Sequence, residues 1–185
     1  SCPNSMRSGE LSSESASHLD FYKQMPESRQ FLTLLSRASR FIDFYLKKAL
    51  EEIDLHSRLE FQFLITIREM KKPGKTDVIN FHLAEISTGV ETLKRLIRRG
   101  LIRESPDPTD RRVRRVELTR KGEEVLDRAL EKFNQLDKLT QSFPVEENWK
   151  NFIPDLLHFN DAHNAIYAGY RDLKLTELFE KLTIQ

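Results

Sequence analysis

The stretch LIRRGLIRESPDPTDRRVRRVELTRKG, residues 96–122, changes its pattern twice and decides the fold. Its first residues end a helical pattern at Gly100, where glycine can supply a left-handed C-cap. Two short runs of strand-like composition, residues 101–104 and 113–118, then flank a loop rich in proline and aspartate. Thr119 follows as the N-cap of a further helix. The stretch therefore predicts the end of a helix, a β-hairpin with a long tip and a second helix.

Two short helical patterns precede this stretch. The first begins near Thr76, and the second begins with TGVE at residues 88–91, which fits a capping box. The second pattern has an apolar face made by Val90, Leu93 and Ile97. Two short helices, a hairpin and a helix form a winged helix-turn-helix domain, in which the second helix enters the major groove and the hairpin is the wing. We therefore expect a mainly α-helical protein with a small β-hairpin wing.

Longer amphipathic helices are predicted on both sides of this domain. Apolar residues recur every three or four positions from residue 28 to residue 53. A helix of this length extends beyond a small domain, so we expect part of its apolar stripe to meet another chain. The predicted parts are a flexible tail at 1–26, a dimerisation helix at 27–56, the winged helix-turn-helix at 57–122, and C-terminal dimerisation helices at 123–185, with a kink or restart at Pro154.

The net charge of +1 gives the whole chain no electrostatic preference for nucleic acid or for acidic membranes. Residues 94–121, however, contain 11 lysines and arginines against four aspartates and glutamates, a net charge of +7. Residues 1–93 have a net charge of −1, and residues 122–185 have a net charge of −5. The basic excess therefore lies in the predicted recognition helix and wing, as expected of a DNA-binding face.

The candidate DNA contacts come from these two elements. Helical spacing with Val90, Leu93 and Ile97 in the core predicts that Thr88, Thr92, Arg95 and Arg99 form the outer face. Thr88 and Thr92 fit a cap or filler role as well as a DNA contact, Glu91 fits a cap better than a base contact, and Arg98 and Arg103 fit solvated surface. The predicted contacts are Ser87, Thr88, Thr92, Lys94, Arg95, Arg99, Arg111, Arg112, Arg114 and Arg115.

The same stretch resembles the MarR (multiple antibiotic resistance regulator) family of transcriptional regulators. The resemblance is strongest over residues 83–126, and the helix order agrees from about residue 28 to residue 167. It rests on three motifs: Gly-Leu-Ile at 100–102, the Asp-x-x-Asp-x-Arg wing at 107–112 and Leu-Thr-x-x-Gly at 118–122.

This resemblance implies a homodimer that represses or activates transcription by occupying a pseudo-palindromic operator in double-stranded DNA. It implies a dimer domain of N- and C-terminal helices and, often, a small aromatic or phenolic effector. It also implies that Asp110 braces the wing, that Arg112 reaches the minor groove and that Arg111 contacts the DNA backbone. Many members carry an arginine where this chain has Glu91, so either the helix reads different bases here or Glu91 serves as a cap.

Other function classes have little support in the sequence. Cys2 is the single cysteine, which excludes an intramolecular disulfide and a thiolate zinc cluster. No apolar run approaches the roughly 20 residues that span a bilayer. We find no Gly-rich phosphate loop and no nucleophile elbow, so neither an enzyme nor a cofactor is expected. A cytoplasmic protein without membrane contact is expected.

The sequence leaves two other functions and a metal site to consider beside DNA binding. A winged helix can serve as a protein-interaction module, with the basic patch docking an acidic partner. A small-molecule-processing enzyme is the weaker third possibility. His158, Asp161 and His163 could suggest a metal site, but the spacing between the two histidines does not place both on one helical face. We therefore predict no metal.

Overall fold

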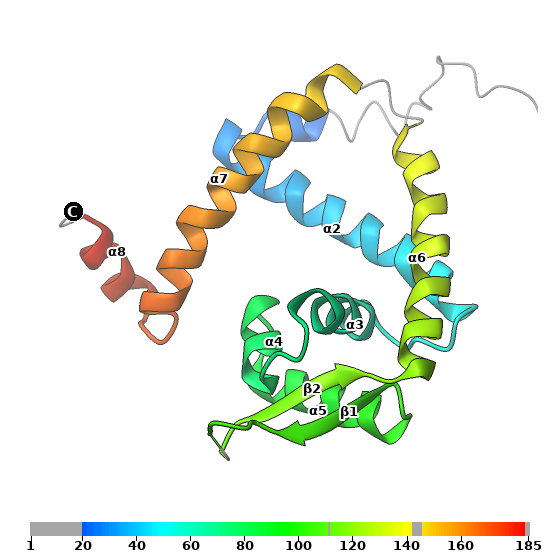
Figure 1. Cartoon of the computed structure of the whole chain (residues 1–185). Helices are drawn as coiled ribbons and strands as arrows, with labels where there is room; N and C mark the ends of the chain where they lie inside the picture. Colours follow the sequence, from blue (N-terminus) through cyan, green and yellow to red (C-terminus); the bar gives the residue numbers. More distant parts are fainter. Residues whose placement is uncertain (1–19, 111, 142–145, 184–185) are drawn as a thin grey trace, which may run out of the picture. The chain divides into compact units, whose positions relative to one another are not determined.

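The computed structural model describes residues 20–110, 112–141 and 146–183 (Figure 1). The chain forms two units, of which the first ends at Asn134 and the second begins at Gln135. The predicted fold class is confirmed: the described residues are mostly helical, with one two-stranded sheet. The elements are α2 (Glu27–Glu51), α3 (Arg58–Met70), α4 (Lys75–Phe81), α5 (Ile86–Arg98), β1 (Ile102–Pro106), β2 (Arg114–Leu118), α6 (Arg120–Gln141), α7 (Glu146–Tyr170) and α8 (Leu175–Thr183).

The two ends of the described chain add detail to the prediction. Residues 20–23, inside the predicted tail, form a helical turn, and residues 1–19 of that tail lie outside the described part. In the second unit, α7 runs as one helix through Pro154. Of the two predicted alternatives, the restart at this proline is therefore wrong, and the kink stays a prediction, since proline removes one backbone donor from the helix. The other helix of this unit is α8, a short amphipathic segment.

The core of the first unit surrounds α3. This helix contacts α2, α4, α5 and β2, and in Figure 1 it lies above the hairpin and beside α4. Its N-cap is Ser57, whose hydroxyl accepts a hydrogen bond from the backbone N–H of Glu60 at 3.2 Å, so one half of a capping box is present. The buried apolar residues are Leu46, Leu50, Ile53, Leu55, Phe61, Phe63, Leu64, Ile67, Val78, Ile79, Leu93, Leu96, Leu101, Ile102, Val116, Val125, Leu126 and Ala129.

The wing is an antiparallel hairpin held against the α3–α4 loop. Its register pairs Ile102 with Leu118, which places Val116 and Ile102 in the core. The backbone N–H of Val116 donates to the carbonyl of Pro73 at 3.0 Å, so the loop extends the sheet. Gly100 has φ +68°, the left-handed conformation that the sequence predicts at the end of α5.

Gly122 explains why the Leu-Thr-x-x-Gly motif closes the domain. The Thr119 hydroxyl caps α6 by accepting from the N–H of Gly122 at 3.1 Å, and the Thr119 N–H donates to the carbonyl of Leu101 at 3.0 Å. A Cβ atom on Gly122 would lie far inside the van der Waals distance of that same carbonyl. The motif therefore brings the first turn of α6 into direct contact with the start of the wing.

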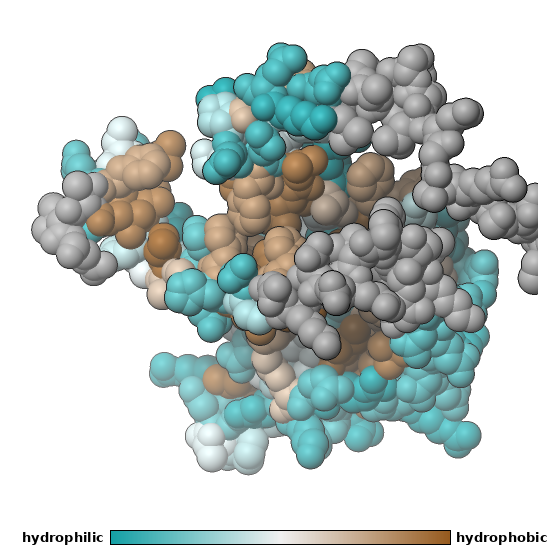
Figure 2. Space-filling view, turned by 90° about the horizontal axis from the view of Figure 1, so that it is seen from above, coloured by the Kyte–Doolittle hydropathy of each residue, from teal (hydrophilic) through white to brown (hydrophobic). Residues whose placement is uncertain are grey.

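Several helices expose large apolar residues. Figure 2, a view from above, shows hydrophobic side chains on this surface in several patches, including one on α8 at its left. None of the described helices is both long and apolar enough to cross a membrane. The exposed apolar residues of α2, α7 and α8 include Leu32, Leu34, Phe41, Ile42, Phe44, Tyr45, Ile153, Leu157, Leu175 and Leu182.

Replacing Gly122 with alanine should destabilise the first unit by about 2 kcal/mol, because the methyl group overpacks a rigid backbone contact. Thermal unfolding followed by circular dichroism measures the change. Gly169→Ala is the matched control: no atom lies within 4 Å of its Cβ position, and alanine favours the helix, so this variant should keep or slightly raise Tm. A Gly122→Ala protein with unchanged Tm would contradict the proposed contact.

Candidate nucleic-acid interface

Close packing against α4 fixes the position of α5, the second helix of the helix-turn-helix. A Cβ atom on Gly89 would lie 2.6 Å from Cγ1 of Ile79, so glycine lets the two helices approach. The helix begins at Ile86, with Glu85 at the N-cap and no side-chain cap. The predicted capping box at residues 88–91 is therefore wrong. This start places Gly89, Thr92, Leu93 and Leu96 on the buried face of α5.

The buried face of α5 differs from the predicted face, so the residues that face solvent differ as well. Four exposed residues, spaced by three or four, lie opposite the buried face and form the outward stripe of α5: Ser87, Glu91, Lys94 and Arg98. Ser87 and Lys94 were predicted as DNA contacts, whereas Arg98 was interpreted as solvated surface and Glu91 as a cap. Thr88 is exposed in the first turn, where backbone N–H groups are free to bind a phosphate.

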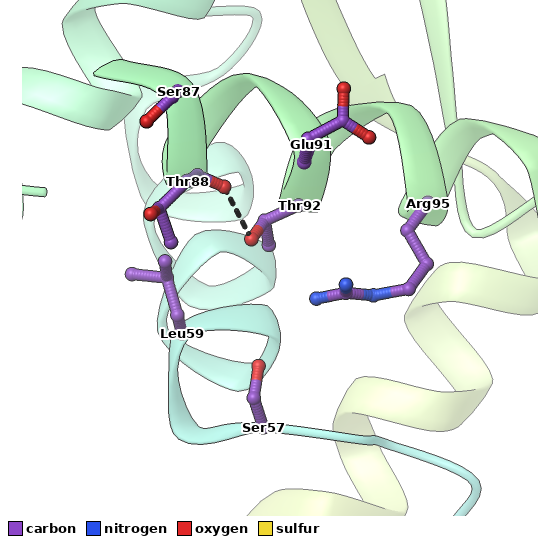
Figure 3. Close-up of a pocket in the computed structure, with 7 residues that line it drawn as sticks. All are labelled: Ser57, Leu59, Ser87, Thr88, Glu91, Thr92 and Arg95. Atoms are coloured by element: carbon purple, nitrogen blue, oxygen red, sulfur yellow. Dashed lines mark hydrogen bonds between the residues drawn. The ribbon is translucent and has the colours of Figure 1, made fainter. Parts of the chain in front are cut away.

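Thr92 does not belong to the outer face. Its exposed fraction is 2%, and its hydroxyl donates to the carbonyl of Thr88 at 2.8 Å (Figure 3). The expectation that Thr92 faces outward is wrong because Gly89, not Val90, makes the closest approach to the core. Beneath it, a shallow hollow of about 460 Å³ lies between α5 and the start of α3, lined in part by Ser57, Leu59 and Arg95.

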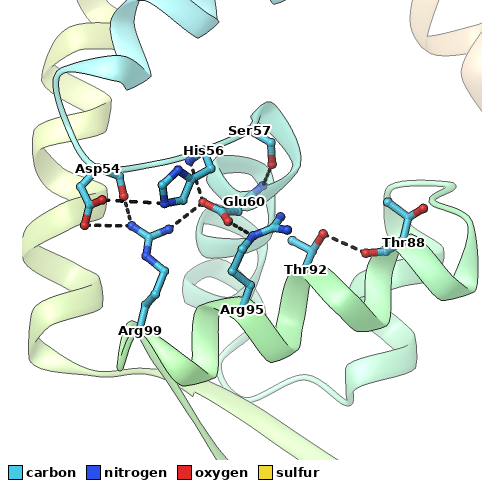
Figure 4. Close-up of polar contacts among 8 residues, drawn as sticks. All are labelled: Asp54, His56, Ser57, Glu60, Thr88, Thr92, Arg95 and Arg99. Carbon is cyan, nitrogen blue, oxygen red and sulfur yellow. Dashed lines mark hydrogen bonds and ion pairs between the residues drawn. The ribbon is translucent and has the colours of Figure 1, made fainter.

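Arg95 and Arg99 also turn inward, toward a buried carboxylate. Glu60 has no exposed surface, and its Oε2 accepts from Nη1 of Arg99 at 2.9 Å (Figure 4). Nε of Arg95 donates to the other oxygen, and the backbone N–H of His56 donates to Oε2 at 2.8 Å. We name these residues, with Asp54, the Glu60 cluster.

The Glu60 cluster ties α5 to the junction between α2 and α3. Arg99 reaches beyond Glu60 to Asp54, whose Oδ2 lies 3.0 Å from Nη2, and it also donates to the Asp54 carbonyl. The Arg99 side chain is 17% exposed and that of Arg95 is 37% exposed. The prediction that both form the outer face is therefore corrected: their guanidinium groups neutralise a buried charge and hold the recognition helix from behind.

Asp107 organises the tip of the wing. It is 4% exposed and accepts from the hydroxyl and the N–H of Thr109, at 2.6 and 2.7 Å, from the N–H of Asp110 at 2.9 Å, and from Nε of Arg115. These donors, first the Thr109 hydroxyl, hold the pKa of Asp107 well below its usual range. The carboxylate of Asp110, predicted as the brace, accepts from the N–H of Arg112 at 2.9 Å, and its carbonyl accepts from the N–H of Val113 at 2.9 Å. The main brace is Asp107, which the sequence analysis missed although Asp-x-Thr is a typical local turn pattern.

The wing arginines differ in what they contact. Arg115 donates to Asp107 and, from Nη1, to the carbonyl of Lys72 at 2.9 Å, so it anchors the wing. Arg114 lies 3.4 Å from Glu104, with half of its side chain exposed. Arg112 is exposed, and no described side chain pairs with its guanidinium group. Arg111 lies outside the described residues.

Ion pairs neutralise much of the remaining charge of this segment. Glu117 lies 2.8 Å from Arg103 and 2.9 Å from Lys72, and hydrogen bonds from Lys72 and then Arg103 lower the pKa of its carboxyl. Glu104 lies 2.6 Å from Lys75. Glu104 and Glu117 are already counted in the net charge of +7, but Glu60 and Glu91, outside that segment, also pair with Arg95, Arg99 and Lys94. The cations that stay available to a ligand are therefore fewer than +7 suggests.

The histidines of α7 do not form a metal centre with their neighbours in the described part of the chain. There, no three His, Cys, Asp or Glu side chains lie close enough to hold a metal ion. His163 stacks on the ring of Phe159 at 3.9 Å between centroids, and its Nδ1 lies 2.8 Å from the Phe159 carbonyl oxygen.

Comparisons with known proteins agree with this geometry. The model of a family described as a winged helix DNA-binding domain matches residues 57–122. The HTH-type transcriptional regulator PecS of Dickeya dadantii (strain 3937) is 31% identical over 134 residues, which cover 70% of this chain and 78% of PecS.

Solved structures show the same fold. A crystal structure of MarR has a TM-score of 0.66 at 22% identity and covers 80% of this chain and 97% of that chain. The transcriptional regulator BldR from Sulfolobus solfataricus has a TM-score of 0.64 at 22% identity, covering 72% and 99%. A mutant MarR from E. coli complexed with operator DNA has a TM-score of 0.61 at 20% identity, covering 74% and 96%.

Replacing Glu60 with glutamine should lower the free energy of unfolding by about 2–3 kcal/mol, because two arginines lose their counter-charge inside the fold. Urea unfolding measures the loss. Glu124→Gln is the matched control, since it removes an exposed pair with Arg120 at 3.0 Å and should change stability by less than about 0.5 kcal/mol. Equal stability of the two variants would show that the Glu60 cluster does not hold α5.

Proposed function

Because this chain belongs to the MarR family of winged helix-turn-helix transcriptional regulators, we propose that it acts as a homodimer on a pseudo-palindromic operator in double-stranded DNA. The observation that carries the proposal is the outward stripe of α5, in which Lys94 and Arg98 are free of the core while Arg95 and Arg99 support the helix from behind. The two recognition helices would enter successive major grooves about 10 base pairs apart.

Each described element has a role in this mechanism. Ser87 and Thr88 lie in the first turn of α5, where free backbone N–H groups favour a phosphate. Lys94 and Arg98 reach the base edges or the backbone of the major groove. Arg112, which is exposed on the wing, would reach the minor groove, where a narrow groove concentrates negative potential. The family resemblance implies that Arg111 contacts the DNA backbone. Arg114 supplies a second cation at the base of the wing.

Dimerisation would bury the apolar faces of the long helices. Ile42 and Phe44 on α2 are about half exposed, as are Ile153 and Leu157 on α7. Exposed patches of this kind mark protein–protein contacts in soluble proteins. We therefore infer that α2 and the helices after residue 123 form the dimer interface, as the family resemblance implies.

An effector would act at the junction of α2 and α3. A hollow of about 460 Å³ lies there, lined in part by Asp43, Lys47, Leu50, His56 and Arg58. It adjoins Asp54 of the Glu60 cluster, so a small aromatic or phenolic molecule in the hollow could shift the population of helix positions that fit the operator. We further infer that the chain acts by binding rather than by catalysis, and in the cytoplasm.

Arg112→Ala should weaken operator binding about ten-fold and reduce the slope of log K against log salt by about one. Tm should stay unchanged, because the Arg112 side chain is exposed and alanine keeps the backbone N–H that donates to Asp110. The operator is first selected from random duplexes and then titrated over a salt series. Arg115→Ala is the contrasting variant: it breaks the contacts with Asp107 and Lys72 and should lower Tm. Binding by the wild type that is weak and independent of salt would favour the protein-interaction alternative.

Sedimentation should find a dimer at micromolar concentration. Ile42→Asp and Leu157→Asp should each raise the dimer dissociation constant about ten-fold or more, since each would bury an unpaired charge in an apolar interface. Ile42→Leu keeps the apolar surface and should remain dimeric. A monomeric wild type would contradict the proposed interface.

A further inference from the structure

Glu91 occupies the centre of the outward stripe, in the second turn of α5. The helix begins at Ile86, with Glu85 at the N-cap, so Glu91 cannot cap it. Figure 3 shows its carboxylate pointing away from α3, whereas the side chains of Thr92 and Arg95 point toward α3. Glu91 lies one turn before Arg95, at the rim of the hollow that both residues line. A side chain in this position faces whatever α5 docks against.

The fold itself gains little from Glu91. Its partner in the described chain is Lys94, whose Nζ lies 2.7 Å from Oε1, and both side chains are more than half exposed. Exposed pairs at this spacing contribute little to the stability of a fold. The hydrogen bond and charge of Lys94 lower the pKa of Glu91, so the carboxylate is ionised at neutral pH and can only accept hydrogen bonds. A bare negative charge facing DNA phosphates is unfavourable unless it meets a donor.

The major groove offers few donors to a carboxylate. These are the N4 amino group of cytosine and the N6 amino group of adenine, and N7 of adenine lies beside N6 as an acceptor that suits asparagine or glutamine. A carboxylate therefore fits cytosine best. The guanine of the same base pair presents O6 and N7, the acceptors that suit a lysine. The Glu91–Lys94 pair thus matches the donor and acceptor edges of one C·G pair.

We propose that Glu91 reads a cytosine in each operator half-site through its N4 amino group, while Lys94 donates to the guanine of the same base pair. This inference rests on the proposed function, because it requires α5 to enter the major groove. It makes Glu91 a specificity-determining residue of α5.

Selection from random duplexes tests the proposal with three proteins: the wild type, Glu91→Gln and Glu91→Ala. The wild type should enrich a C·G pair at one fixed position of each half-site. Glu91→Gln should change the preference at that position to A·T, because glutamine pairs bidentately with adenine. Glu91→Ala should weaken the preference there to the part that Lys94 gives through the guanine, and it should keep the remaining motif. A carboxylate that merely orients Lys94 would not produce the change to A·T.

Titration of the selected operator makes the result quantitative. Replacing the C·G pair by T·A in one half-site should weaken wild-type binding about ten-fold and weaken Glu91→Ala binding clearly less, because only the Lys94 contact with the guanine is then lost. Glu124→Gln, an exposed acid of α6, should behave as the wild type. An unchanged C·G preference in Glu91→Ala overturns this inference and leaves the proposed function standing. A wild type that enriches no motif overturns both.

Discussion

The buried carboxylate of Glu60 determines how the recognition helix is held. It lies at the start of α3 without exposed surface, so its charge has to be satisfied inside the fold. Arg95 and Arg99, which follow one another by a turn of α5, supply two cations, and the N–H of His56 supplies a further donor. Because Arg99 also binds Asp54, the orientation of α5 depends on the junction between α2 and α3.

This constraint separates the basic residues into two groups. The arginines that lie nearest to buried acids are part of the architecture: two hold α5 through Glu60, and Arg115 holds the wing through Asp107. The cations that remain free, such as Arg98 and Arg112, project from the same two elements. In the winged helix, the arginines paired with buried acids therefore fix the positions of α5 and the wing, and the unpaired cations of the same elements are left to meet DNA.

The helices and strands could be predicted from the sequence, but the buried face of α5 could not. The hairpin, Gly100 and the Leu-Thr-x-x-Gly closure follow from local chemistry, because turns, left-handed glycines and caps depend on a few adjacent residues. The register of α5 depends on Gly89 contacting Ile79, a tertiary contact that apolar periodicity does not encode. The pattern of polar and apolar residues also predicts that Thr92 is exposed because it is polar. It can be buried because its hydroxyl donates a hydrogen bond to the backbone of its own helix. Asp107 accepts mainly from Thr109 and Asp110, so its local Asp-x-Thr pattern could have identified it, whereas the contact with Arg115 requires the folded hairpin.

Two glutamates separated along the chain illustrate why the structure is needed to assign roles. Glu60 and Glu91 are the same residue type, and both lie close to arginines and lysines of α5. Glu60 is buried, so its removal leaves charges unpaired in the core and changes stability. Glu91 is exposed and makes one surface pair, so its removal costs the fold little and changes what the helix can recognise. A residue that reads a base must not be needed to hold the fold together. On α5 that structural role falls to Arg95 and Arg99, whose side chains bind Glu60, and not to Glu91.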